Sequence, residues 1–125
     1  RSVSSAASDV YKRQLQMFDS LSKFSSLPGE TKVFCTHEYT LSNLAFALAV
    51  EPDNVDLKKY YEKVSFLRDS NKISLPSNID LENKINPFLR TSVDQVKDNA
   101  ENYAKKQNLQ PVEVLAAIRD WKDNF

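Results

Sequence analysis

The chain has 125 residues, the length of one domain with one modest core. Its 17 Lys and Arg residues balance 17 Asp and Glu residues, so no net charge favours nucleic acid or an anionic membrane. One Cys excludes an internal disulfide, which fits a reducing, cytoplasmic compartment, and no run approaches the roughly 18 apolar residues of a membrane-spanning helix. A single Gly argues against a complete β-rich enzyme and predicts a mainly α-helical chain.

Residues 1–14 are serine-rich, do not begin with Met and lack the apolar core of a signal peptide. We expect a non-native leader here, and a disordered native tail fits the sequence equally well. Ser8 or Asp9 could also cap a helix that runs toward Leu27.

Residues 15–27 form the first predicted amphipathic helix, which Pro28 and Gly29 end. Its apolar side chains recur at spacings of three and four: Met17, Phe18, Leu21 and Phe24. A short apolar run at 32–36 follows and predicts a buried strand. Helix and strand together form an αβ step. Since one strand cannot form a sheet, we expect the strands that would pair with it to lie outside this chain.

His37 is the only histidine and lies between this predicted strand and the next helix. Ligand sites collect at such strand ends in α/β sheets, and neutral imidazole is the commonest zinc ligand. A lone histidine is more often a hydrogen-bonded structural residue, so both interpretations stay open on position alone. Cys35 would share the strand face of His37, but a lone Cys in an apolar strand usually serves packing, and we leave it out of the site.

Three further helices are predicted between residues 39 and 85. The first covers 39–50 and ends at Glu51-Pro52, and the second begins at a cap formed by Asp53 or Asn54 and ends at 69–71. Residues 73–77 are expected to be extended, and Asn78 to cap a brief helix through Ile85. The apolar stripe of the second helix consists of Leu57, Tyr60, Tyr61, Val64 and Leu67.

Two helices are predicted to complete the chain. Ser92 and Gln95 have the spacing of a capping box, and the helix behind them should reach 107–108. Pro111 suits the first position of the last helix, because the missing N–H of Pro has no partner there anyway. Its predicted buried side consists of Val114, Ile118, Trp121 and Phe125.

Arg119 and Lys122 are three residues apart on this last helix, so their cationic groups can converge on one anion. Taken alone, such a pair is more often a solvated surface or part of a salt bridge to Asp120 or Asp123.

Several blocks of the sequence resemble the hydroxyacylglutathione hydrolases (glyoxalase II), in the order and approximate spacing of that family. They are 37–40 (HEYT), Asn43, 46–47 (FA), 51–54 (EPDN), 75–77 (LPS), 86–90 (NPFLR) and 119–125 (RDWKDNF). The resemblance covers residues 15–125 and concerns only the C-terminal part of such an enzyme. It implies that 15–37 end a metallo-β-lactamase αββα domain and that 38–125 form the small C-terminal helical domain. The expected fold is therefore mainly α with a residual αβ step.

The resemblance also implies a site. Two divalent metal ions, zinc first with iron or manganese compatible, would hold a bridging hydroxide, and His37 would be the final ligand after an upstream Thr-His-x-His-x-Asp-His block. Tyr39, Arg119 and Lys122 would bind the glutathione half of the substrate. A cation suits this role because glutathione ends in a carboxylate, which Arg grips bidentately and Lys as a point charge.

The implied activity of the intact protein is metal-dependent hydrolysis of S-lactoylglutathione to D-lactate and glutathione. We expect that protein to be a cytoplasmic monomer that binds neither nucleic acid nor membranes, and this chain alone to be inactive. Two alternatives stay open: a stand-alone helical binding module, and a structural protein whose apolar surface at 15–35 is an interface. An in-frame upstream metal-binding block would favour the hydrolase.

Overall fold

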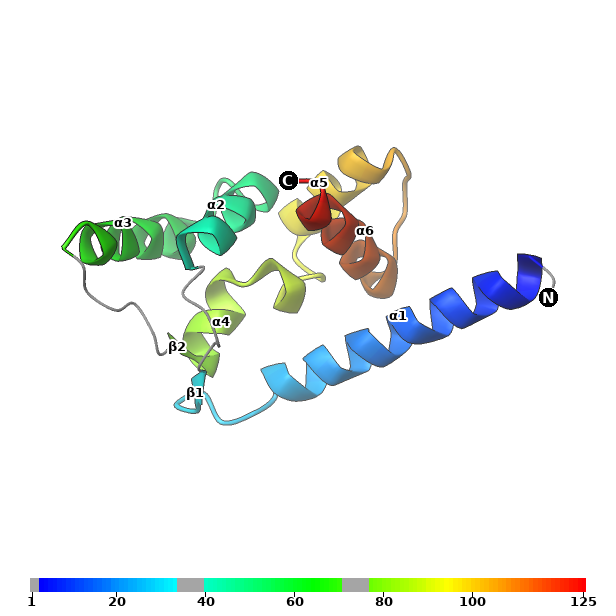
Figure 1. Cartoon of the computed structure of the whole chain (residues 1–125), viewed down its shortest axis with the longest axis horizontal. Helices are drawn as coiled ribbons and strands as arrows, with labels where there is room; N and C mark the ends of the chain where they lie inside the picture. The colour runs from blue at the N-terminus through cyan, green and yellow to red at the C-terminus, as the bar shows by residue number, and fades with distance from the viewer. Residues whose placement is uncertain (1–2, 34–39, 71–76) are drawn as a thin grey trace.

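The structure is a computed structural model that describes residues 3–33, 40–70 and 77–125. It is mainly α-helical, as predicted, and α1 lies along one side of the other helices, with α3 and α6 toward opposite ends (Figure 1). The elements are α1 (Val3–Ser25), β1 (Lys32–Val33), α2 (Thr40–Val50), α3 (Val55–Asp69), β2 (Ser77–Asn78), α4 (Ile79–Ile85), the 3-10 helix η1 (Pro87–Leu89), α5 (Asp94–Ala104) and α6 (Pro111–Asp123).

The first helix is longer than the sequence predicted. It begins at Val3, so Ser8 and Asp9 lie inside it and the predicted cap is wrong. No Pro or Gly interrupts the chain before Pro28, so nothing ends the helical hydrogen-bond ladder upstream of residue 15. The predicted apolar face of α1 is half-buried, because α1 packs against α4, η1 and α6.

The predicted strand at 32–36 has a partner within this chain, which corrects our expectation that it would have none. β1 pairs antiparallel with β2, with Lys32 opposite Asn78 and Val33 opposite Ser77. The backbone N–H groups of Ile79 and Asp80 extend the contact by donating to the carbonyls of residues 31 and 29, each at 3.0 Å. This ladder ties the segment after α1 to the start of α4, while 34–36 lie outside the described residues.

Asparagine caps begin α3 and α4. Asn54, rather than Asp53, caps α3 by accepting a hydrogen bond from the Leu57 N–H at 3.1 Å. Asn78 accepts from the Leu81 N–H at 2.8 Å, and α4 ends at Ile85, so the prediction for this short helix is confirmed.

The capping box predicted at Ser92 and Gln95 is wrong. Val93 occupies the N-cap position of α5, and Gln95 bonds instead to Asp53, accepting from its backbone N–H at 3.0 Å and donating to its carboxylate at 2.7 Å. This contact ties α5 to the segment before α3. α5 also ends earlier than predicted, at Ala104, because Lys105 adopts a left-handed conformation with φ of 57°.

α2 connects two clusters of buried side chains. One joins α2 to α5 and α6, and the other joins α2 to α3 and α4. Pro111 begins α6 as predicted, and Val114 and Ile118 are buried. Phe125 is 63% exposed although its ring contacts Phe46, so its prediction as a buried residue is wrong. The clusters consist of Phe46, Val50, Val96, Ala100, Leu109, Val114 and Ile118, and of Leu44, Ala47, Leu57, Val64 and Ile85.

Within the described residues, no helix is both long and apolar enough to cross a membrane.

Candidate functional site

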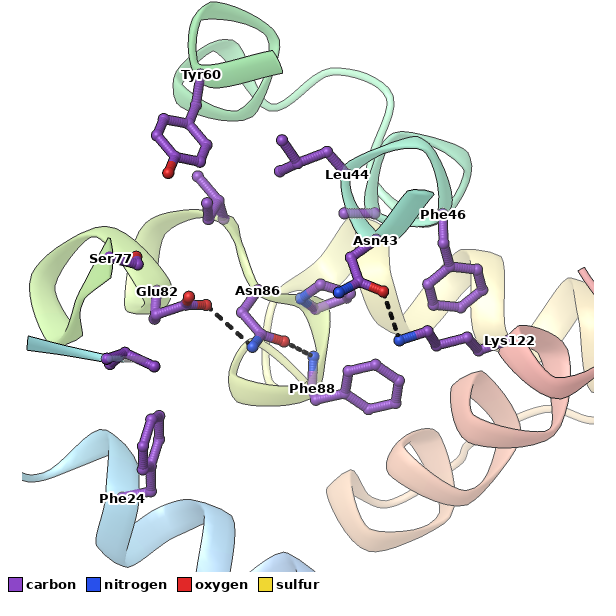
Figure 2. A pocket seen from close by; sticks show the side chains of 14 residues that line it. Phe24, Asn43, Leu44, Phe46, Tyr60, Ser77, Glu82, Asn86, Phe88 and Lys122 are labelled. Carbon is purple, nitrogen blue, oxygen red and sulfur yellow. Dashed lines mark hydrogen bonds between the residues drawn. The ribbon is translucent and has the colours of Figure 1, made fainter. Parts of the chain in front are cut away.

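A pocket of about 200 Å³ lies where α2, α4, η1 and the end of α6 meet β1 and α1 (Figure 2). Apolar side chains from both core clusters line much of its wall, and polar groups come from α2, β2, α4, the residue between α4 and η1, and α6. The apolar lining includes Leu44, Phe46, Ala47, Ile85 and Pro87, and the polar lining includes Asn43, Ser77, Glu82, Asn86 and Lys122.

Lys122 reaches from α6 across to α2, as Figure 2 shows. Its Nζ donates a hydrogen bond to Asn43 Oδ1 at 2.9 Å and lies 5.7 Å from the centroid of the Phe88 ring. Among the described residues no carboxylate forms an ion pair with it, unlike Lys23, which pairs with Asp19. A full positive charge therefore stands at the pocket with a neutral hydrogen-bond partner.

Asn86 fixes the segment that carries the Phe88 ring. Its Oδ1 accepts from the Phe88 N–H at 2.9 Å, and its Nδ2 donates to Glu82 Oε2 at 3.1 Å. Pro87 occupies the first position of η1, where its fixed φ suits the turn. The ring beside Lys122 is thus held by a short capped 3-10 helix.

Ser77 lies on the far side of the pocket from Lys122 (Figure 2). The residue is 8% exposed, and its Oγ has no hydrogen-bond partner within the described part of the chain. Leaving a buried hydroxyl unpaired costs about 1–3 kcal/mol, so a ligand group that bonds to it would recover that free energy. The pocket therefore has polar groups at both sides, with the hydrogen-bonded Glu82 and Asn86 side chains between them and apolar side chains over much of the remaining wall (Figure 2).

Arg119 faces a different hollow, between α1 and α6. Its guanidinium group donates to the sulfur of Met17, and the same hollow is lined by Arg13, Asp120 and Asp123. Residues three apart on an α-helix differ by about 60° around its axis. This difference is enough for Arg119 to contact α1 while Lys122 contacts α2. In this structure the groups of Arg119 and Lys122 do not meet, and neither pairs with Asp120 or Asp123.

A sequence model described as "Hydroxyacylglutathione hydrolase C-terminus" matches residues 38–125, most of the chain. The chain belongs to this hydroxyacylglutathione hydrolase family. Curated relatives named hydroxyacylglutathione hydrolase come from Pseudomonas aeruginosa strain PAO1 (53% identical), Aliivibrio fischeri strain MJ11 (54%) and Pseudomonas fluorescens strain SBW25 (51%). Each match covers 110 residues, which is 88% of this chain and 43% of the relative. The chain thus spans less than half the length of these hydrolases.

Two of the predicted site residues, His37 and Tyr39, lie outside the described residues, as does Cys35. Among residues 3–33, 40–70 and 77–125, no three His, Cys, Asp or Glu side chains are placed so that they could hold a metal ion. The described part of this family member therefore does not by itself fit the two metal ions that the resemblance implies.

Sequence reasoning missed a polar network beside the pocket, which we call the Arg90 joint and which consists of Glu51, Asn54, Asn83 and Arg90. Arg90 donates to both carboxylate oxygens of Glu51, from Nε at 2.7 Å and from Nη2 at 2.8 Å. Its Nη1 donates to the Asn83 carbonyl at 3.1 Å. Asn54 Nδ2 donates to Glu51 Oε1 at 3.1 Å and to the carbonyl of residue 84 at 2.8 Å.

The Arg90 joint connects the end of α2, the cap of α3, α4 and the residue after η1. The hydrogen bond to Glu51 raises the pKa of Arg90 above its ordinary value, although burial acts in the opposite direction. Two of the blocks that carried the family resemblance, 51–54 and 86–90, meet here. Their resemblance was visible in the sequence, but nothing in their spacing indicated that Glu51 and Arg90 would pair across 39 residues.

Proposed function

We propose that this chain is the glutathione-binding part of a hydroxyacylglutathione hydrolase. The intact protein would hydrolyse S-lactoylglutathione to D-lactate and glutathione as a cytoplasmic monomer. One observation carries the role of this chain: Lys122 holds an ammonium group without a counter-ion, among the described residues, beside a largely apolar pocket in a member of this family.

The pocket chemistry suits glutathione. The glycine end of glutathione is a carboxylate, and a hydrogen bond between that group and Lys122 is charge-assisted, which makes it stronger than a neutral one. Apolar walls lower the local dielectric and strengthen the attraction. Glutathione is a peptide with polar groups at both ends, which matches a pocket with Lys122 on one side and, on the other, the Ser77 hydroxyl, which has no hydrogen-bond partner among the described residues.

Tyr39 and Arg119 stay in the proposal as further glutathione contacts. Tyr39 would add a neutral hydroxyl donor without changing the charge of the site. Arg119 would contribute a second cation, but its guanidinium group contacts Met17 in this structure, so it reaches the same carboxylate only through another rotamer. We therefore assign the larger share of the binding energy to Lys122.

Metal dependence is proposed for the intact protein, with zinc first and iron or manganese as alternatives. His37 is the one residue of this chain that we propose as a ligand. Catalytic zinc sites use three protein ligands, so the remaining ligands would lie in the part of the hydrolases that this chain does not span. The 125-residue chain by itself is then expected to bind glutathione and not to hydrolyse its thioesters.

A chimeric enzyme tests the proposal directly. Residues 38–125 of this chain replace the matching part of the Pseudomonas aeruginosa hydrolase, and hydrolysis of S-lactoylglutathione is followed over time. We expect a folded, metal-dependent thioesterase whose KM rises on Lys122→Ala. A chimera that melts cooperatively but hydrolyses no thioester would contradict the proposal. If the 125-residue chain nevertheless bound glutathione, the stand-alone binding module would be the better interpretation.

A further inference from the structure

We propose that Asn43 is a positioning residue for Lys122, which it holds at the pocket in the orientation that receives an anionic ligand group. This inference rests on the proposed function, because the ligand group is the glycine carboxylate of glutathione. Asn43 contributes the amide oxygen that accepts from Lys122 Nζ at 2.9 Å (Figure 2).

The backbones that carry Asn43 and Lys122 are held by the core beneath them. Phe46 lies three residues after Asn43, on the same side of α2, and is 1% exposed. Its ring packs edge-on against Trp121, the residue before Lys122, with centroids 5.7 Å apart. The contact between Asn43 and Lys122 therefore stands on a buried aromatic contact between the same two helices.

A neutral partner suits a lysine that must bind an anion. The amide oxygen accepts one of the three N–H groups of the ammonium and leaves two available, without neutralising the charge. A carboxylate at the same place would attract the ammonium more strongly, but it would offset the positive charge and repel the incoming carboxylate of the ligand. The described surface lysines that do pair with carboxylates, Lys23 and Lys97, have no such available charge.

Holding the lysine in advance also lowers the cost of binding. An unrestrained lysine side chain samples many rotamers. A ligand that must order this side chain binds more weakly, because the side chain loses conformational entropy on binding. Asn43 restricts the ammonium from one side, and the Phe88 ring, 5.7 Å from Nζ, supports it through a cation–π contact. The alternative interpretation of Asn43 is that its hydrogen bond with Lys122 stabilises the fold and has no part in ligand binding.

Binding of two probes to the 125-residue chain separates these roles. The probes are glutathione and the analogue in which the glycine carboxylate is an amide, and titration calorimetry gives each Kd. Asn43→Ala should weaken glutathione binding about two- to tenfold, the range for one hydrogen bond, and leave binding of the amide unchanged. Ser42→Ala, an exposed neighbour in the same turn that does not line the pocket, should change neither Kd.

Two further variants sharpen the test. In the Lys122→Ala background, Asn43→Ala should have no additional effect, because the two residues act through one interaction. Asn43→Asp keeps an oxygen acceptor but adds a negative charge, so it should weaken glutathione binding more than Asn43→Ala does. Thermal melting of every variant confirms that it is folded.

Each outcome bears on one of the two proposals. If the unaltered chain binds no glutathione, or if Lys122→Ala binds it normally, the proposed function fails. If Lys122→Ala weakens binding but Asn43→Ala does not, the positioning role alone is overturned. Equal losses for both probes, or an undiminished effect of Asn43→Ala in the Lys122→Ala background, would likewise show that Asn43 is structural and does not act through Lys122.

Discussion

Two cations near the same pocket differ in how their charge is balanced. Arg90 lies in a buried joint where Glu51, 5% exposed, meets it with both carboxylate oxygens. Lys122 lies at the pocket surface, where a neutral amide and an aromatic ring are its described partners. A buried charge requires a counter-charge, whereas an exposed charge can be left unbalanced because water solvates it until a ligand arrives. The difference separates a residue that holds the fold from one that is available for binding.

Removing the counter-charge of the Arg90 joint should have the largest effect on stability. Glu51→Ala leaves the guanidinium of Arg90 partly buried without its carboxylate, and breaking a buried pair in this way costs about 3–5 kcal/mol. We expect that loss in the free energy of unfolding measured by urea titration. Lys97→Ala is the matched control, because it breaks a partly exposed pair with Glu101 within one helix and should cost at most about 1 kcal/mol. Similar losses for the two variants would show that the joint is not the structural connection we describe.

Much of the helical part of this fold could be predicted from local sequence, because its signals are local. Asn54, Asn78 and Pro111 act within one turn of their own helices, so their caps and the helix they begin follow from spacing. Gln95 shows the limit of that reasoning. Its spacing from Ser92 fits a capping box, but Asp53 offers both a backbone N–H and a carboxylate from a distant part of the chain, and that contact prevails.

The candidate site was predictable only in part, for a related reason. The family resemblance pointed to Lys122, and the structure adds the pocket beside it, which depends on α2, α4 and η1 meeting α6. The partners of Lys122, Asn43 and Phe88, lie 79 and 34 residues away along the chain, and no periodicity connects residues at such distances.

Lys122→Ala should have a large effect on substrate affinity and little on the fold. In the chimeric hydrolase we expect KM for S-lactoylglutathione to rise roughly ten- to 150-fold, the equivalent of about 1.5–3 kcal/mol for a charge-assisted hydrogen bond. The value of kcat should change comparatively little, since the glycine carboxylate keeps its charge through thioester cleavage. Melting of the variant separates this effect from damage to α6. A normal KM in a folded variant would remove Lys122 from the site.

Arg119→Ala should raise KM in the same direction but by less than Lys122→Ala. The guanidinium group must leave Met17 before it can reach the ligand, so part of its interaction energy is offset by the contact that it loses. We expect an increase of about tenfold or less, corresponding to about 1.4 kcal/mol. Comparing KM for the two single variants and the double variant measures whether both cations grip one carboxylate. An effect larger than that of Lys122→Ala would mean that the bound state places Arg119, and not Lys122, against the ligand.

Tyr103→Phe should have the smallest effect, and one that depends on pH. Tyr103 donates from its hydroxyl to Asp120 Oδ2 at 2.8 Å, and its ring stacks on Trp121. The hydrogen bond to Asp120 raises the pKa of Tyr103 above its ordinary value of 10.0, because the folded state favours the neutral phenol. The raised pKa means that this contribution to stability is fully present below pH 10.0 and is lost as the pH rises through the folded-state value.

Phenylalanine at position 103 keeps the stacking on Trp121 and lacks the hydroxyl. The difference in unfolding free energy between the unaltered chain and Tyr103→Phe should therefore be constant from about pH 7 to pH 9 and shrink at higher pH, where other tyrosines affect both proteins alike. A difference that grows above pH 10.0 would mean that the folded state favours the phenolate, which contradicts the hydrogen bond to Asp120.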